Sequence, residues 1–256
     1  MSDNESLVFG LHAVTAALRE QPPRVLELWL DRQRRDARMH RLVEVATAAG
    51  VVCQQVPRAA LDRMLPGAIH QGVIARVLAR AAGGEGELEV LLDGLREPAL
   101  LLCLDGVSDP HNLGACLRTA EGAGVHGVVV PRDRAAGLTP VVRKVASGAA
   151  ERLPFFQVVN LARSLKALRE RGLWVIGAAA EAEVSLYQSD LSGPLVLVLG
   201  AEGKGLRRLT RETCDALVRV PLQGDCQSLN VAVATGVCLF EARRQRAVIA
   251  APGGGR

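Results

Sequence analysis

The sequence predicts an α/β protein built from two domains. Short apolar runs of strand length alternate with segments in which apolar residues recur at helical spacing, and a glycine-rich acidic stretch interrupts this alternation near residue 83. The chain has 256 residues, 49% of them hydrophobic and 23% charged, so it can bury a core and is too well mixed to be disordered. This length slightly favours two domains over one.

Residues 1–78 are expected to form a small first domain. Apolar periodicity predicts helices over 7–19, 32–49 and 59–64, and strands over 25–30, 51–56 and 72–77. The run AAGGEGE then combines small and acidic residues without an apolar period, as a solvated linker does. Residues 79–97 are therefore expected to link the two domains.

Residues 98–248 are expected to form a second, larger α/β domain. The apolar run LLLCL ends in Asp105 and Gly106, which is typical of a strand buried in a parallel sheet. Further strands are expected over 125–130, 153–158, 173–177, 195–199 and 216–220, and helices over 161–171 and 228–246. The sheet should be mostly parallel, with its ligand beyond the carboxyl ends of the strands. Residues 249–256 are expected to be a flexible tail.

Several classes of protein are excluded by composition and spacing. No run approaches the ~18 apolar residues of a membrane span, and the opening MSDNE lacks the basic and apolar regions of a signal peptide, so a cytoplasmic location is expected. The six cysteines form no C-x-x-C pair and are expected to be reduced. The five histidines include no ligand pair such as H-E-x-x-H, so no metal site is expected.

The net charge of +4 is too small to single out a nucleic-acid partner by itself. Most of the basic residues are arginines, whose planar fork suits phosphate oxygens, although a codon bias towards arginine explains the excess equally well. Five of them lie within ten residues and are expected to form either a patch for RNA phosphates or a solvated helix face: Arg32, Arg34, Arg35, Arg38 and Arg41. Because only 3% of residues are aromatic, recognition should use phosphates, ribose hydroxyls and RNA shape rather than base stacking.

Two glycine-rich strings match nucleotide-binding motifs but lie in the wrong context. The string GAGVHG at 122–127 follows a helix and precedes a strand, which is the reverse of a dinucleotide-binding motif. The string GKG at 203–205 lacks the Ser or Thr that follows the lysine of a phosphate loop. A dinucleotide-binding enzyme and a nucleoside triphosphatase are therefore excluded.

Three other loops combine glycine with functional polar groups, and each follows an apolar strand. They are DGVSDPHNLGACLRTA at 105–120, LGAEGKGL at 199–206, and a third that begins with VPL at 220 and ends with SLNVAVA at 234. Loops that follow parallel strands meet at one edge of the sheet. We therefore expect these three loops to assemble one site.

These three segments resemble, in order and in spacing, the three signature motifs of the SpoU (TrmH-like) RNA ribose 2′-O-methyltransferases. The resemblance extends to GLHAV at 10–14 and HQGV at 70–73 and covers about residues 7–246. It implies a trefoil-knotted catalytic domain, an obligate homodimer, S-adenosylmethionine as methyl donor, and an N-terminal RNA-binding domain similar to ribosomal protein L30e. Within the family the chain is most similar to enzymes that methylate a guanosine ribose of large-subunit (23S) ribosomal RNA, in the peptidyl transferase centre.

Methyl transfer to a ribose 2′-hydroxyl requires the hydroxyl to be oriented and relieved of its proton, because it is a poor nucleophile. Arg118 lies on the first helix beyond a strand, where it could hold an RNA phosphate and assist deprotonation; the resemblance makes it the leading catalytic residue and allows it to act across the dimer interface. A surface ion pair is the alternative for Arg118. Asn112 could contact substrate or cap the helix, and Glu202 could serve the site or be a solvated loop acid.

The third loop and the methyl donor account for the remaining site residues. Ser228 and Asn230 open the last helix, so Ser228 could be a cap, whereas Asn230 is the stronger candidate for a catalytic role. The resemblance assigns donor binding to Gly200, Val220 and Leu229, with core packing as the alternative for Val220. Two other functions stay open: the same chemistry on transfer RNA, and a non-catalytic RNA-binding protein of the same fold.

Overall fold

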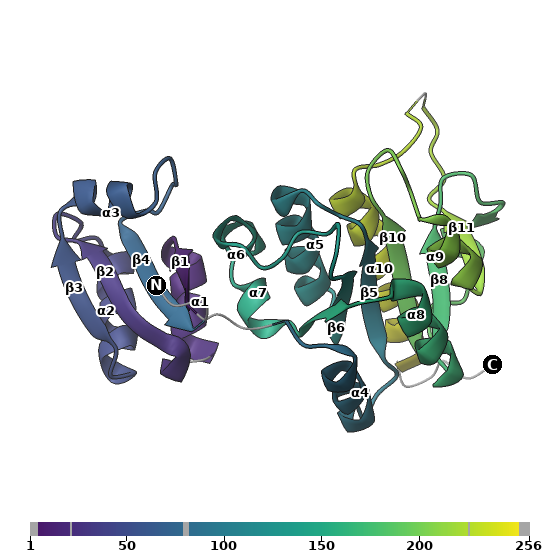
Figure 1. Cartoon of the computed structure of the whole chain (residues 1–256), viewed down its shortest axis with the longest axis horizontal. Helices are drawn as coiled ribbons and strands as arrows, with labels where there is room; N and C mark the ends of the chain where they lie inside the picture. The colour runs from purple at the N-terminus through teal and green to yellow at the C-terminus, as the bar shows by residue number, and fades with distance from the viewer. Residues whose placement is uncertain (1–4, 21, 79–81, 225, 251–256) are drawn as a thin grey trace. The chain divides into compact units, whose positions relative to one another are not determined.

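The computed structural model describes residues 5–20, 22–78, 82–224 and 226–250, and the chain divides into two compact units (Figure 1). The first unit comprises residues 1–81 together with 138–152, and the second comprises 82–137 and 153–256. Both units combine strands with helices. The division differs from the expected domains at 138–152, which group with the first unit.

The first unit contains a four-stranded sheet in the order β1-β4-β2-β3. The β2/β3 pair is parallel and the other two pairs are antiparallel. Its strands are β1 (Glu5–Phe9), β2 (Val25–Asp31), β3 (Val52–Val56) and β4 (Val73–Leu78). Its helices are α1 (Leu11–Glu20), α2 (Ala37–Ala48), α3 (Arg58–Met64), α6 (Pro140–Ala146) and α7 (Ala149–Arg152), with a 3₁₀ turn at Pro22–Arg24.

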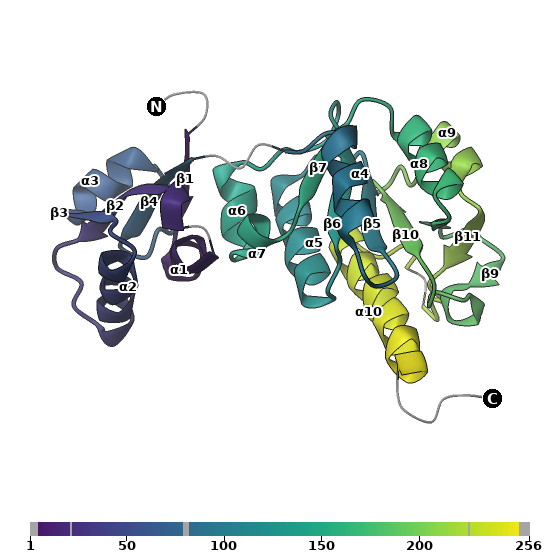
Figure 2. The same ribbon diagram turned by 90° about the horizontal axis from the view of Figure 1, so that it is seen from below.

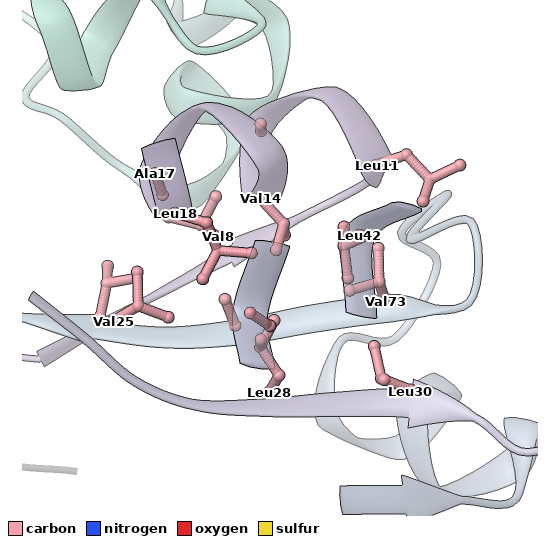
Figure 3. Packing of buried hydrophobic residues seen from close by; sticks show 14 of the residues in the cluster. Val8, Leu11, Val14, Ala17, Leu18, Val25, Leu28, Leu30, Leu42 and Val73 are labelled. Carbon is pink, nitrogen blue, oxygen red and sulfur yellow. The ribbon is translucent and has the colours of Figure 1, made fainter. Parts of the chain in front are cut away.

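The core of the first unit lies between α1, α2 and one face of the sheet (Figure 3). Leu18, Leu28 and Leu42 are almost completely buried there. A helix is expected over 7–19, but residues 5–9 form β1 and the helix starts only at Leu11. The positive φ of Gly10 turns the chain between the two elements, and β1 gains an antiparallel partner in β4 that periodicity alone does not reveal.

The second unit contains a seven-stranded, entirely parallel sheet in the order β7-β6-β5-β10-β8-β11-β9. Its strands are β5 (Leu100–Asp105), β6 (Gly127–Pro131), β7 (Phe155–Val158), β8 (Trp174–Ala178), β9 (Val184–Ser185), β10 (Leu195–Gly200) and β11 (Ala216–Arg219). Every residue of β5 is buried, as expected for a central parallel strand. The prediction of a mostly parallel sheet is confirmed.

Helices cover both faces of this sheet. Figure 2 shows α5 (Pro110–Gly122) and α10 (Val231–Ala250) on one face, and α4 (Glu85–Gly94), α8 (Leu161–Glu170) and α9 (Arg208–Thr213) on the other. A 3₁₀ turn at Leu186–Gln188 follows β9. The chain passes from β5 outward to β6 and β7 and then returns to the other side of β10, so the strand order reverses beside β5 and β10. Ligands of open parallel sheets bind at such a reversal.

The segment 79–97, expected to be a solvated linker, contains helix α4. Residues 79–81 lie outside the described residues, but from Glu85 the chain is helical, and the carboxylate of Glu87 accepts a hydrogen bond from the Gly84 N–H at 2.9 Å. Leu88 is buried in the core of the second unit, with Leu91 and Leu92 packed beside it. The apolar i, i+3, i+4 spacing of these leucines makes the segment part of the fold.

The expected tail at 249–256 differs in part from the structure. Residues 249 and 250 belong to α10, and 251–256 lie outside the described residues. Among the helices of the described ranges, none is long and apolar enough to cross a membrane.

Candidate active site

The three polar loops meet at the carboxyl edge of the parallel sheet of the second unit. Asp105 at the end of β5 is in register with Gly200 at the end of β10, so the first two loops leave the sheet side by side. The third loop runs from the end of β11 to the start of α10. Strand order therefore brings together the segments that the sequence places far apart.

Asn112, Glu202 and Asn230 form one hydrogen-bonded cluster. The Asn230 Nδ2 group donates to Asn112 Oδ1 at 3.0 Å and to Glu202 Oε2 at 3.4 Å. The Asn112 Nδ2 group donates to the same Glu202 oxygen at 3.3 Å. The three residues come from all three loops, so the cluster brings a carboxylate and two amides to one point.

The hydrogen bonds also show which residues cap the helices α5 and α10. The N-cap of α5 is Asp109, whose carboxylate accepts the His111 N–H at 3.0 Å, so Asn112 is free to turn towards Glu202. Asn230 Oδ1 accepts the Ala232 N–H at 2.9 Å and thereby caps α10. Ser228 lies two residues before Asn230, the residue that directly precedes α10 and makes the capping hydrogen bond.

Arg118 is exposed on α5, six residues and therefore between one and two turns beyond the cluster residue Asn112. Among the described residues its guanidinium has no hydrogen-bond or ion-pair partner. All of its donors are therefore available to a ligand.

A cavity of about 400 Å³ lies next to the cluster, within the range of small-molecule sites. Gly200, Val220 and Leu229, the three residues expected to bind the methyl donor, all line it, as do Glu202 and Ser228. Apolar walls come from Leu199, Val218 and Val231 as well. A cavity with apolar walls, main-chain groups and a few charged side chains, Glu181 and Glu202 among them, suits an adenosyl group.

Gly200 is required by the backbone that surrounds the cavity. A Cβ atom at Gly200 would lie 2.0 Å from the carbonyl carbon of Gly205 and 2.4 Å from the Leu206 nitrogen. The loop folds back on itself at this point, since the Gly205 N–H donates to the Ala201 carbonyl at 2.9 Å. The tight return holds main-chain groups where a ligand can approach them, which supports the assignment of Gly200 to the donor site.

Asp105 anchors both ends of this loop. Its main-chain carbonyl accepts the Ala201 N–H at 3.2 Å, and its buried carboxylate accepts the Arg207 N–H at 2.8 Å. Sequence patterns mark Asp105 only as the end of a strand. They also miss Ala178 at the end of β8 and Glu181 in the loop that follows, which line the cavity because β8 lies next to β10.

The five clustered arginines of the first unit divide into two kinds. Arg34 is half-buried and paired with Asp36, it donates to the Gln71 carbonyl, and its hydrogen bond lowers the pKa of Asp36. The other four are exposed: Arg32, Arg35, Arg38 and Arg41. Arg34 therefore holds the turn before α2 together, and the expected phosphate patch is reduced to the remaining four.

The strings GLHAV and HQGV, which contribute to the resemblance, pack against each other in the first unit. The side chain of Gln71 accepts the Leu11 N–H at 3.1 Å at the start of α1. Buried His70 accepts the Gly72 N–H at 3.0 Å and lies 2.9 Å from the carboxylate of Asp62. The contacts of Gln71 and His70 are therefore structural.

No group of three His, Cys, Asp or Glu side chains that could hold a metal ion occurs among the described residues. The donors at the cluster are one carboxylate and two amides.

The fold and this cluster define a class of protein, and comparison with known families agrees: the chain belongs to the SpoU rRNA methylase family, whose model matches residues 99–240. A second model, RNA 2′-O ribose methyltransferase substrate binding, matches residues 7–80. The chain is 57% identical over 239 residues to the 23S rRNA (guanosine-2′-O-)-methyltransferase RlmB of Pseudomonas syringae, covering 93% of this chain and 95% of that one. It is 54% identical over 242 residues to the RlmB of Shewanella oneidensis, covering 94% and 98%.

Solved structures give the same answer. The SpoU methyltransferase AviRb of Streptomyces viridochromogenes in complex with AdoMet matches with a TM-score of 0.79 and 25% identity, covering 95% of this chain and 91% of that one. An AdoMet-bound rRNA methyltransferase of Sinorhizobium meliloti matches with a TM-score of 0.76 and 26% identity, covering 94% and 87%. The SpoU fold is thereby confirmed.

Proposed function

We propose that this protein transfers a methyl group from S-adenosylmethionine to the ribose 2′-hydroxyl of a guanosine in 23S ribosomal RNA. The observation that carries the proposal is the cluster of Asn112, Glu202 and Asn230 beside the cavity lined by Gly200, Val220 and Leu229. The extensive similarity to RlmB enzymes supports both the reaction and the substrate.

Each site residue has a distinct task in this reaction. The donor supplies an electrophilic methyl group when it is bound, and Gly200, Val220 and Leu229 hold its adenosyl part in the cavity. Arg118 holds a phosphate of the RNA, orients the acceptor ribose and assists the loss of the hydroxyl proton. A guanidinium without a protein partner suits this task because it need not break an ion pair first.

The cluster itself orients the acceptor and the donor loop. Glu202 accepts hydrogen bonds from both amides, so it fixes which amide atoms face the ligand. Asn112 and Asn230 thereby present defined donors and acceptors to the ribose, and Ser228 adds a hydroxyl at the cavity wall. Side chains supply both proton transfer and orientation in this scheme, which includes no metal ion.

Other features of the enzyme follow from the same family. We propose a trefoil knot in the catalytic domain at 98–248, an RNA-binding domain similar to ribosomal protein L30e at 1–78, and a target in the peptidyl transferase centre. We also propose a homodimer, which the exposed apolar side chains of Val233 and Phe240 on α10 support. An enzyme that modifies ribosomal RNA would act in the cytoplasm.

The decisive experiment incubates the protein with labelled S-adenosylmethionine and separate pools of unmodified ribosomal and transfer RNA. We expect one 2′-O-methylguanosine in the large-subunit RNA, mapped by mass spectrometry. Label on transfer RNA would agree with the proposed reaction but contradict the proposed substrate. Donor binding without methylation of either pool would instead indicate a non-catalytic RNA-binding protein.

A further inference from the structure

The loop that follows β6 carries two arginines that the proposed mechanism does not use. Arg132 and Arg134 flank Asp133, and all three residues are exposed, directly after the fully buried strand β6. Among the described residues neither guanidinium has a hydrogen-bond or ion-pair partner. Two unpaired guanidinium groups so close together in the sequence are a candidate contact for an anionic ligand.

The loop lies at the edge of the sheet where the active site is built. β6 pairs in parallel with β5, so the chain leaves β6 at the same carboxyl edge from which Asp105 and the first motif emerge. The Ala136 N–H donates to the carbonyl of buried Val107 at 2.9 Å, which ties the loop directly to that motif. At its other end, the Arg132 N–H donates to the Val158 carbonyl at 2.8 Å. The loop is therefore anchored on both sides while its guanidinium groups stay exposed.

The backbone at Arg134 is unusual. Its φ of +61° lies in the left-handed region, which is unfavourable for a non-glycine residue and which glycine adopts freely. Among the described residues, no hydrogen bond or ion pair of the guanidinium compensates for this backbone conformation. Arg134 therefore occupies a backbone conformation that favours glycine, which indicates a functional role for its positive charge.

From these observations we infer that Arg132 and Arg134 bind backbone phosphates of the RNA beside the methyl acceptor, next to the phosphate held by Arg118. The inference rests on the proposed function and adds a second contact between the catalytic unit and its substrate. RNA fits better than a small anion because two cations separated by one residue match successive charges along a polyanion. The negative charge of Asp133 offsets one of the two positive charges. The loop therefore has a net positive charge only when both arginines are present.

The test measures binding of the full-length protein to an unmodified 23S ribosomal RNA transcript over a range of salt concentrations. The variants are Arg132→Gln, Arg134→Gly and the double substitution, with Arg134→Lys as a variant that keeps the charge. Arg96→Gln is the matched control, because Arg96 is also exposed but precedes β5 at the opposite edge of the sheet.

We expect each single neutral variant to weaken RNA binding about tenfold near physiological salt, and to reduce the slope of log affinity against log salt by about one. Arg134→Lys should retain the slope. Affinity for S-adenosylmethionine, measured by calorimetry, should stay unchanged, and Arg134→Gly should be at least as thermally stable as the wild type because it relieves the φ angle.

Slopes equal to that of the wild type, or lowered as much by Arg96→Gln, would overturn the inference. The proposed function is judged separately, by whether the wild-type protein methylates the transcript. An active wild-type enzyme whose loop variants bind RNA normally would refute only the role of the loop.

Discussion

At Gly200 a single added methyl group would collide with main-chain atoms. A Cβ atom there would lie 2.2 Å from the Gly205 oxygen, so Gly200→Ala must displace the loop that closes the cavity. We expect the variant to lose most of its affinity for S-adenosylmethionine and about 1–3 kcal/mol of stability, as overpacking does. Calorimetric titration and urea unfolding measure the two effects.

Gly193→Ala provides the control for this substitution. A Cβ atom at Gly193 would meet nothing within 4 Å, so donor binding and stability should stay close to those of the wild type. Normal donor binding by Gly200→Ala would contradict the assignment of this glycine to the donor site.

Buried thiols make stability depend on alkaline pH. Burial raises the pKa of Cys116 from 9.0 to about 11 and that of Cys238 from 9.0 to about 12. Above pH 9 the unfolded chain therefore loses these protons while the folded chain keeps them, so the free energy of unfolding falls as the pH rises towards 12. Urea titrations under reducing conditions between about pH 8 and about pH 10.5 should show this decline.

Substitution of single cysteines tests the cause of the decline. Cys238→Ala should flatten the pH dependence, although it also lowers stability at about pH 8 by leaving a cavity. Cys226→Ser removes an exposed thiol and should leave the dependence as it is. If Cys238→Ala and the wild type decline equally over this range, ionisation of that thiol is not the cause.

At the scale of elements, the turn before α2 and the helix itself carry arginines with different tasks. Neutralising exposed Arg35 and Arg38 should weaken RNA binding by the first unit and reduce its salt slope by about one for each phosphate that is no longer bound. Arg34→Gln should instead destabilise the protein, because Arg34 holds Asp36 and the Gln71 carbonyl. RNA titrations and thermal unfolding separate the two effects.

The salt dependence of RNA binding and the melting temperature distinguish a role in RNA binding from a structural role. A salt slope that is unchanged in Arg35→Gln together with Arg38→Gln would assign them to a solvated helix face. An Arg34→Gln protein that melts like the wild type would show that its contacts contribute little.

Elements also show where sequence patterns succeed and fail. The patterns predict β5 and α8 within one or two residues because their apolar periods are unambiguous. They miss strand β1 because its residues continue the apolar pattern of the helix that follows, and only pairing with β4 makes them a strand. They miss helix α4 because the glycine and acidic residues at its start are typical of a linker, and the leucines with helical spacing come only after them.

At the scale of the whole molecule, the proposed dimer determines how an active site is completed. We expect Arg118 to act in the site of the partner subunit, so proteins carrying Arg118→Ala or Asn230→Ala should each be inactive. When the two are unfolded and refolded together, mixed dimers contain one intact site, and about a quarter of the wild-type activity should return if mixing is statistical. Methyl transfer to 23S ribosomal RNA measures it.

Sedimentation and circular dichroism are the controls for this experiment. Both variants must remain folded dimers, since a collapsed Arg118→Ala protein would make the loss of activity structural. Folded mixed dimers without recovered activity would place Arg118 in the site of its own subunit. A monomeric, active wild-type protein would refute the dimer itself.

Local patterns are enough to predict the α/β class, the mostly parallel sheet and the three polar loops, because strand and helix periods and the polar residues after strands are local properties of the chain. The expected roles of Arg118 and of the donor-binding residues Gly200, Val220 and Leu229 come instead from the resemblance of these loops to the SpoU family. What those residues touch is a property of the folded molecule. Asn112 meets Glu202 across 90 positions and Asn230 across 118, and Arg34 rather than its neighbours is tied to Gln71. Such contacts depend on which strands become neighbours and how the chain returns between them, and no local pattern encodes that order.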